Sequence, residues 1–285
     1  MSLKYISLGF RELLGAFAVF ILKSIRCIPF SITYSSLKIL IPFYYKTRPQ
    51  HIASVKRKID SSPFSKELTL NQYYQHRLQL LLNNIYWHGQ PHLPPQSKIL
   101  NEHYLEKALQ VNCPLVILSL HMGPFELLHK GAYQKTKKAH RPYYVLTAKA
   151  FSKTLTQYMN SGRETEGKKT VLNRKIGSSL KKIIQQNGVL AMMVDQSPLR
   201  DHESLTLWGT HTLPFNDKLL SLLLNKGAIL LPLSCYQKGK TTVLTYHEPI
   251  AKPHLKTKIT EFLEKEIAQA PAQWNWSYGG IKVKS

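Results

Sequence analysis

From residue 114 onward, short runs of apolar residues alternate with segments whose apolar residues recur at helical spacing. The runs at 114–120, 189–194 and 228–235 are apolar almost throughout, which is typical of strands buried on both faces. Strands that alternate with helices in this way predict an α/β fold, with a central, largely buried mixed sheet flanked by helices. The expected strands are 114–120, 143–147, 189–194, 228–235 and 241–247, and the expected helices are 67–86, 126–133, 151–159, 176–186, 217–224 and 255–268.

The first 48 residues differ in composition from the rest of the chain. Residues 13–22 form an apolar run between Arg11 and Lys23, and residues 27–45 are apolar and aromatic. The first run is shorter than the roughly 20 residues that cross a bilayer, and no cleavage site of small residues follows it. We therefore expect an apolar, helical, membrane-associating segment at 1–48 that lies in the headgroup region, and a separate domain at 49–285. The alternative is that these helices belong to the core of a soluble domain.

The chain is strongly basic. Its 39 Lys and Arg residues face 16 Asp and Glu residues, a formal net charge of +23 spread along the sequence. Such an excess indicates a polyanionic partner, which can be an anionic bilayer, a phosphorylated glycolipid, an acidic carrier protein or a nucleic acid. The sequence has neither zinc-finger spacing nor an aromatic RNA-binding motif, so a nucleic-acid partner is not expected.

Two polar clusters follow expected strands at their carboxyl ends, where ligands gather in open α/β sheets. The first contains His121 and Glu126, and the second is Asp195 with Gln196. Glu126 is expected in the first turn of a helix, from which its carboxylate can reach back to the imidazole. A carboxylate on one ring nitrogen fixes the tautomer, and the other nitrogen can then take a proton from a hydroxyl. The alternative is a core histidine beside a glutamate that caps a helix.

Metal and disulfide chemistry find little support in the sequence. The three cysteines are far apart and form no C-x-x-C pair. His88 and His92 are four residues apart, but they lie in a Pro-rich loop that cannot hold both on one helical face. We therefore expect no metal site.

Six segments match one enzyme family in order and spacing. They are 121–126 (HMGPFE), Arg163 with Gly167, 188–196, 207–209, 226–232 and 271–276. Together they cover about residues 50–282 and resemble the bacterial lipid A late acyltransferases (lauroyl and myristoyl transferases) of the lysophospholipid acyltransferase superfamily, which carry an H-x4-D/E block.

The resemblance implies an acyltransferase domain at 49–285. It would move a fatty acyl chain from a thioester, borne by acyl carrier protein or coenzyme A, to a hydroxyl of a membrane glycolipid such as a lipid A precursor. His121 would be the general base with Glu126 as its partner. Arg163, Asp195 and Gln196 would bind substrate: Arg163 through a phosphate of the acceptor or the charge developing on the thioester oxygen, and Asp195 by holding Arg163 or a backbone amide.

The same resemblance implies a place in lipopolysaccharide biosynthesis, on the cytoplasmic face of the bacterial inner membrane. The acyl thioester is a substrate, so no cofactor is expected. Pro124 and Phe125 replace the Asn and Trp that are usual in the family's block. This departure leaves one alternative open, a non-catalytic, basic membrane- or glycolipid-binding protein that retains the fold.

Overall fold

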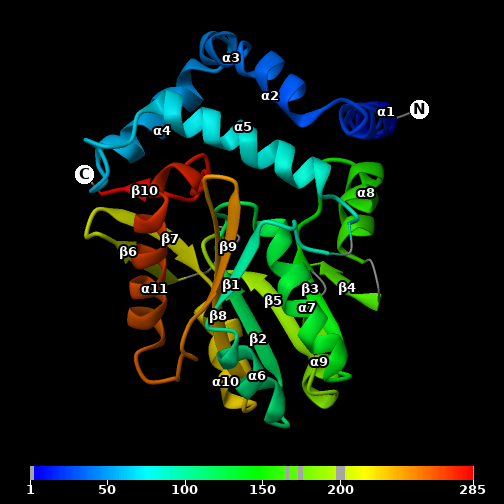
Figure 1. Ribbon diagram of the computed structural model, residues 1–285, viewed down its shortest axis with the longest axis vertical. Helices are drawn as coiled ribbons and strands as arrows, with labels where there is room; N and C mark the ends of the chain where they lie inside the picture. Colours follow the sequence, from blue (N-terminus) through cyan, green and yellow to red (C-terminus); the bar gives the residue numbers. More distant parts are fainter. Residues whose placement is uncertain (1–2, 91, 165–166, 173–175, 197–202, 285) are drawn as a thin grey trace.

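A computed structural model describes residues 3–90, 92–164, 167–172, 176–196 and 203–284. Its main feature is a seven-stranded sheet with strand order β1-β9-β8-β2-β5-β3-β4, beside a three-stranded antiparallel sheet, β10-β7-β6 (Figure 1). Within the large sheet only β8 and β9 pair antiparallel, so the expected mixed sheet is confirmed. The strands are β1 Ser97–Leu100, β2 Leu115–Ser119, β3 Tyr143–Thr147, β4 Lys169–Leu172, β5 Val189–Met193, β6 Glu203–Leu207, β7 His211–Phe215, β8 Ile229–Lys238, β9 Thr241–Tyr246 and β10 Lys282–Val283.

Helices flank the sheet on both faces, because alternate residues of the central strands point to opposite sides. Val116 and Leu118 of β2 belong to one apolar core, and Leu115 and Ile117 belong to the other. The first core includes residues of α9, α10 and α11, and the second includes residues of α6 and α7. These helices are α6 His103–Gln110, α7 Leu128–Lys138, α9 Ile176–Gln185, α10 Asp217–Asn225 and α11 Leu255–Gln269.

The N-terminal helices lie together across one end of the sheet (Figure 1). They are α1 Leu3–Ile25, α2 Phe30–Lys38, α3 Ile41–Thr47, α4 Pro49–Asp60 and α5 Leu70–Tyr86. Helix α4 is rich in basic residues, yet its Val55 and Ile59 are buried. Among the described helices, none is both long enough and apolar enough to cross a membrane.

A carboxylate fixes α1 to the rest of the molecule. Both oxygens of Glu12 accept backbone N–H groups at the start of α8 (Lys153–Arg163), from Lys153 at 2.7 Å and Thr154 at 3.0 Å. These N–H groups have no partner within their own helix, so the carboxylate completes the helix end and meets its dipole favourably. The contact places α1 against the helix that carries Arg163.

The elements expected from the apolar pattern are present, with their ends shifted by a few residues at most. The exception is 126–133, which begins as a short 3-10 helix, η1 Phe125–Leu127, and continues as α7. The pattern missed α4, α6 and the strands β1, β4, β6, β7 and β10, which are short or only partly apolar.

Candidate active site

His121 and Asp195 meet at the carboxyl end of the sheet. β2 and β5 are adjacent parallel strands, with Ser119 paired to Met193. His121 and Asp195 each lie two residues beyond this last pair, so the register itself brings them together. His121 Nδ1 is 2.8 Å from Asp195 Oδ1, and the His121 backbone N–H donates to Oδ2 at 2.9 Å.

The Asp195 carboxylate is buried, with 1% of its surface exposed. A third donor, the indole Nε1–H of Trp274, reaches Oδ2 at 3.0 Å. These bonds satisfy a charge that would otherwise be costly to bury, and they fix the carboxylate in one orientation. The His121 side chain remains about one quarter exposed. Because its Nδ1 faces Asp195, its Nε2 is the ring nitrogen left for a substrate.

The turn after His121 packs too closely for most side chains. Gly123 has φ +59, and a Cβ there would lie 2.3 Å from the Cys235 carbonyl oxygen. The Gly123 N–H donates to the Gln273 carbonyl at 3.3 Å, and Met122 forms an isolated bridge with Trp274. The segment that supplies the indole of Trp274 therefore also holds the backbone of the turn.

The expected contact between Glu126 and His121 is wrong. Arg163 Nε donates to Glu126 Oε2 at 2.9 Å, and Arg163 Nη2 donates to the other carboxylate oxygen. A bidentate ion pair between a guanidinium and a carboxylate is among the strongest hydrogen-bonded interactions in proteins. Because Arg163 is paired with Glu126, the expectation that Asp195 holds Arg163 is also wrong. The other expected contact of Asp195, a hydrogen bond from a backbone amide, is present, and the amide is that of His121. The part that Glu126 plays in catalysis stays a prediction.

The ion pair controls the charge of both side chains. Burial alone would raise the pKa of Glu126, but the Arg163 guanidinium lowers it to about 2. Burial likewise opposes the charge on Arg163, and Glu126 outweighs it and raises the arginine pKa. Both groups are therefore ionised at neutral pH.

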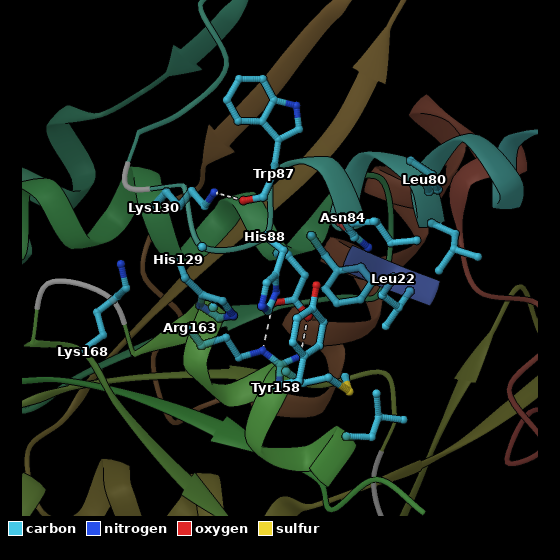
Figure 2. A pocket seen from close by; sticks show the side chains of 18 of the residues that line it. Leu22, Leu80, Asn84, Trp87, His88, His129, Lys130, Tyr158, Arg163 and Lys168 are labelled. Carbon is cyan, nitrogen blue, oxygen red and sulfur yellow. Dashed lines mark hydrogen bonds and ion pairs between the residues drawn. The ribbon is translucent and has the colours of Figure 1, made fainter. Parts of the chain in front are cut away.

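Two neighbouring cavities share the ion pair as part of their lining. The smaller, about 220 Å³, is lined by His121 and by apolar residues of β3 and β5. The larger, about 350 Å³, lies between α1, α5, α7 and α8 (Figure 2). Phe125, Glu126, His129, Met159 and Arg163 line both. The base and the ion pair thus lie beside space for an elongated ligand.

Sequence reasoning missed several residues of this region. Trp274 is fully buried, and its indole N–H donates to Asp195. His129 and Lys130 belong to no recognised motif. The one signal for them in the sequence is their position, one helical turn beyond Glu126, which places them on the same side of the helix. Gln196 follows Asp195, and its Nε2 has no hydrogen-bond partner among the described residues.

Residues 78–278 match the model of the bacterial lipid A biosynthesis acyltransferases. The chain belongs to this family. As a member of the lipid A biosynthesis acyltransferase family, it is an acyltransferase in the broad sense, and the resemblance found in the sequence is confirmed. A search of curated proteins gave no match.

The family match covers the whole candidate site. His121, Glu126, Arg163, Asp195 and Trp274 all fall within residues 78–278 of this acyltransferase, as does the second half of α5, which lines the larger cavity. Helices α1 to α4 lie outside the matched region.

Proposed function

We propose that this acyltransferase moves a fatty acyl chain from a thioester to a hydroxyl of a membrane glycolipid, such as a lipid A precursor, with His121 as general base. The observation that carries the proposal is the hydrogen-bonded pair of His121 and Asp195 beside an amphipathic cavity. This is the base half of a catalytic triad without its serine, so the acceptor's own hydroxyl serves as the nucleophile.

Each group then has a defined part in the transfer. His121 Nε2 takes the proton of the acceptor hydroxyl as its oxygen attacks the thioester carbonyl carbon. Asp195 stabilises the imidazolium and keeps the ring in place. The tetrahedral intermediate collapses with cleavage of the carbon–sulfur bond, and the imidazolium returns the proton to the leaving thiolate. The products are an ester and a free thiol.

Arg163 has a role that its contacts support. A guanidinium has five N–H donors, and Glu126 accepts two of them. In our proposal a remaining N–H stabilises the oxyanion of the tetrahedral intermediate, and Glu126 positions the guanidinium for this purpose. Glu126 is then a positioning residue that acts through Arg163.

The identities of the acyl donor and of the acceptor are also proposed. The thioester supplies an activated acyl group, so the reaction as written needs no cofactor. The net charge of +23 favours an acidic acyl carrier protein as donor and an anionic membrane surface as the source of the acceptor. Turnover with acyl carrier protein should exceed turnover with acyl-coenzyme A and should fall as ionic strength rises.

A lipid profile of cells with and without the chain tests the proposed function. We expect a glycolipid that is heavier by one acyl group only in cells that express the active chain, and not in cells that express His121→Ala. Identical lipid profiles in the two strains would contradict the transfer reaction.

Loss of the indole N–H at Trp274 should slow turnover. Trp274→Phe keeps an aromatic ring but removes the bond to Asp195, and we expect kcat to fall about 10-fold with KM nearly unchanged. Trp276→Phe is the matched control, because its indole N–H donates at 2.8 Å to the Pro271 carbonyl and does not touch the pair. Steady-state kinetics give kcat and KM of both variants, and thermal unfolding gives their stability. An equal loss of kcat in both variants would assign Trp274 to packing alone.

We also propose that the chain acts at the cytoplasmic face of the inner membrane, held there by α1 to α3. These helices expose large apolar side chains, Phe17, Phe20, Ile32 and Phe43 among them, next to lysines and arginines. Such a surface suits the interfacial layer of an anionic bilayer.

Flotation with anionic vesicles tests the membrane surface. The full chain should float with vesicles even at high salt, because apolar burial is not screened. Phe17→Asp with Phe20→Asp should reduce the bound fraction at least about 10-fold. Val111→Asp is the control, since Val111 is also half-exposed but lies at the end of α6. Unchanged flotation of the double variant would exclude α1 as the docking surface.

A further inference from the structure

The larger cavity has an apolar side and a polar side. Leu22 of α1 and Leu80 of α5 lie on one side, and Lys130 and Lys168 lie on the other (Figure 2). Leu81, Ile85, Leu155 and Met159 add to the apolar lining. The cavity therefore suits a molecule with an apolar chain at one end and a polar group at the other.

Positive charge dominates the polar side. Among the described residues that line the cavity, Arg77, Lys130, Arg163 and Lys168 are cations, and Glu126 is the one carboxylate. Glu126 is already bonded to Arg163 through both oxygens. The carboxylate is thus engaged by the guanidinium, and the charge of Lys130 stays available for a ligand.

Lys130 is 5% exposed. Its ammonium donates to the Trp87 carbonyl at 2.5 Å and lies 5.9 Å from the centre of the Trp87 ring. Burial and the nearby charge of Lys168 lower the pKa of Lys130 to about 8, so it remains mostly charged at neutral pH. A buried ammonium held by a neutral carbonyl and a ring is costly unless an anion compensates it.

Three buried polar atoms of residues that line the same cavity have no hydrogen-bond partner among the described residues. They are Asn84 Oδ1, His129 Nδ1 and the Tyr158 hydroxyl oxygen. Burial lowers the pKa of His129 to about 4, so its ring is neutral and can donate through one nitrogen. Buried polar atoms of this kind are rarely left unsatisfied. The His129 ring and the Tyr158 hydroxyl can donate to oxygens of a ligand, whereas Asn84 Oδ1 can only accept from an N–H or O–H of that ligand.

We infer that the polar side of the cavity binds the phosphate group of an amphipathic phosphate ester. Lys130 supplies the charge, and the Tyr158 hydroxyl and the His129 ring donate to phosphate oxygens. The apolar side takes the attached chain. The inference rests on the proposed acyl transfer for its place in the reaction, since it names the chemistry of a substrate for that site.

Two substrates can supply this phosphate. One is the acceptor, if its headgroup is phosphorylated. The other is the donor, because acyl carrier protein and coenzyme A both attach the acyl chain through phosphopantetheine. Both present a phosphate ester next to a long, partly apolar arm, so one site can serve either.

Calorimetric binding to the full chain in dodecyl maltoside micelles tests the site without any turnover. The probes are dodecyl phosphate, 4′-phosphopantetheine and the uncharged pantetheine. We expect at least one of the two phosphates to bind and pantetheine to bind at least about 10-fold more weakly. Binding of dodecyl phosphate alone assigns the site to the acceptor, and binding of 4′-phosphopantetheine assigns it to the donor arm. Absence of binding by both phosphates would overturn the inference.

Two variants with matched controls locate the bound phosphate. Lys130→Met should weaken phosphate binding about 10- to 100-fold, and Lys138→Met, an exposed lysine of the same helix, should leave it unchanged. Tyr158→Phe should weaken it about 3- to 10-fold without loss of an internal hydrogen bond. Tyr246→Phe removes a buried hydroxyl elsewhere and should have no effect.

The outcomes separate this inference from the proposed function. If the folded variants at 130 and 158 bind phosphate as well as the unaltered chain does, the site is not in this cavity. If phosphate binding follows these residues but no acyl transfer is found, the proposed function fails and the phosphate site stands.

Discussion

Replacement of His121 by alanine should lower kcat about 10²- to 10⁴-fold, because it removes the group that accepts the hydroxyl proton. Asp195→Asn should cost at least about 100-fold. Asp195 accepts three hydrogen bonds through two oxygens, whereas an asparagine amide has only one oxygen. The NH₂ group of that amide would therefore either face a donor or donate to His121 Nδ1, and the second arrangement fixes the wrong tautomer of the ring. The double variant should be little worse than His121→Ala, since the two residues act as a unit.

Acyl transfer measured with purified, folded variants checks this result. His103→Ala and Asp60→Asn are matched controls, because both residues are exposed and lie outside the cavities. Turnover of His121→Ala near that of the unaltered chain would remove the general base and leave the alternative of a glycolipid-binding protein that has kept the fold. Multiplicative losses in the double variant would show that Asp195 acts independently of His121.

Removal of Arg163 should produce the largest loss of stability. Arg163→Met leaves the Glu126 carboxylate without its ion-pair partner, and we expect the free energy of unfolding to fall by about 3 kcal/mol. This is the lower end of the range for a broken buried pair, because both side chains also contact a cavity. Arg163→Met with Glu126→Gln should recover most of the loss, since no unpaired charge remains. Urea denaturation of the single and double variants measures both effects.

The pH dependence of stability gives a second readout of the same pair. Arg163 depresses the folded-state pKa of Glu126 from 4.5 to about 2. The stabilisation is therefore fully present above pH 4.5 and is lost as the pH falls toward 2. In Arg163→Met, burial raises this pKa, so the variant should become less stable as the pH rises through the ordinary titration range of a carboxyl group.

An exposed ion pair provides the control for both measurements. Lys56 and Asp60 lie 2.5 Å apart on the surface of α4, and Lys56→Met should change the free energy of unfolding by less than about 1 kcal/mol. An equally small change in Arg163→Met would show that the pair of Glu126 and Arg163 adds little to stability. No recovery in the double variant would show that Arg163 stabilises the fold through other contacts.

The central strands were predictable because burial on both faces leaves a strong trace in the sequence. Residues 115–119 and 189–193 have almost no polar side chain, so a run of apolar residues marks them directly. β1 and β4 have no continuous apolar run, since they lie at the edges of the sheet and are only partly buried. Helix α4 was missed because its basic residues conceal an apolar face that packs on the rest of the fold.

The sequence by itself determined that His121 and Asp195 follow buried strands, and that ligands gather at such strand ends. It could not determine that the two strands are neighbours, because 74 positions separate the two residues and strand order is not encoded in local spacing. Glu126 was the natural partner on spacing alone, five residues from His121. The tertiary structure decided otherwise, since the parallel register of β2 and β5 brings Asp195 to the imidazole, and α8 brings the guanidinium of Arg163 to Glu126. A guanidinium binds a carboxylate through two hydrogen bonds, and only the packing of α8 against the turn made that partner available.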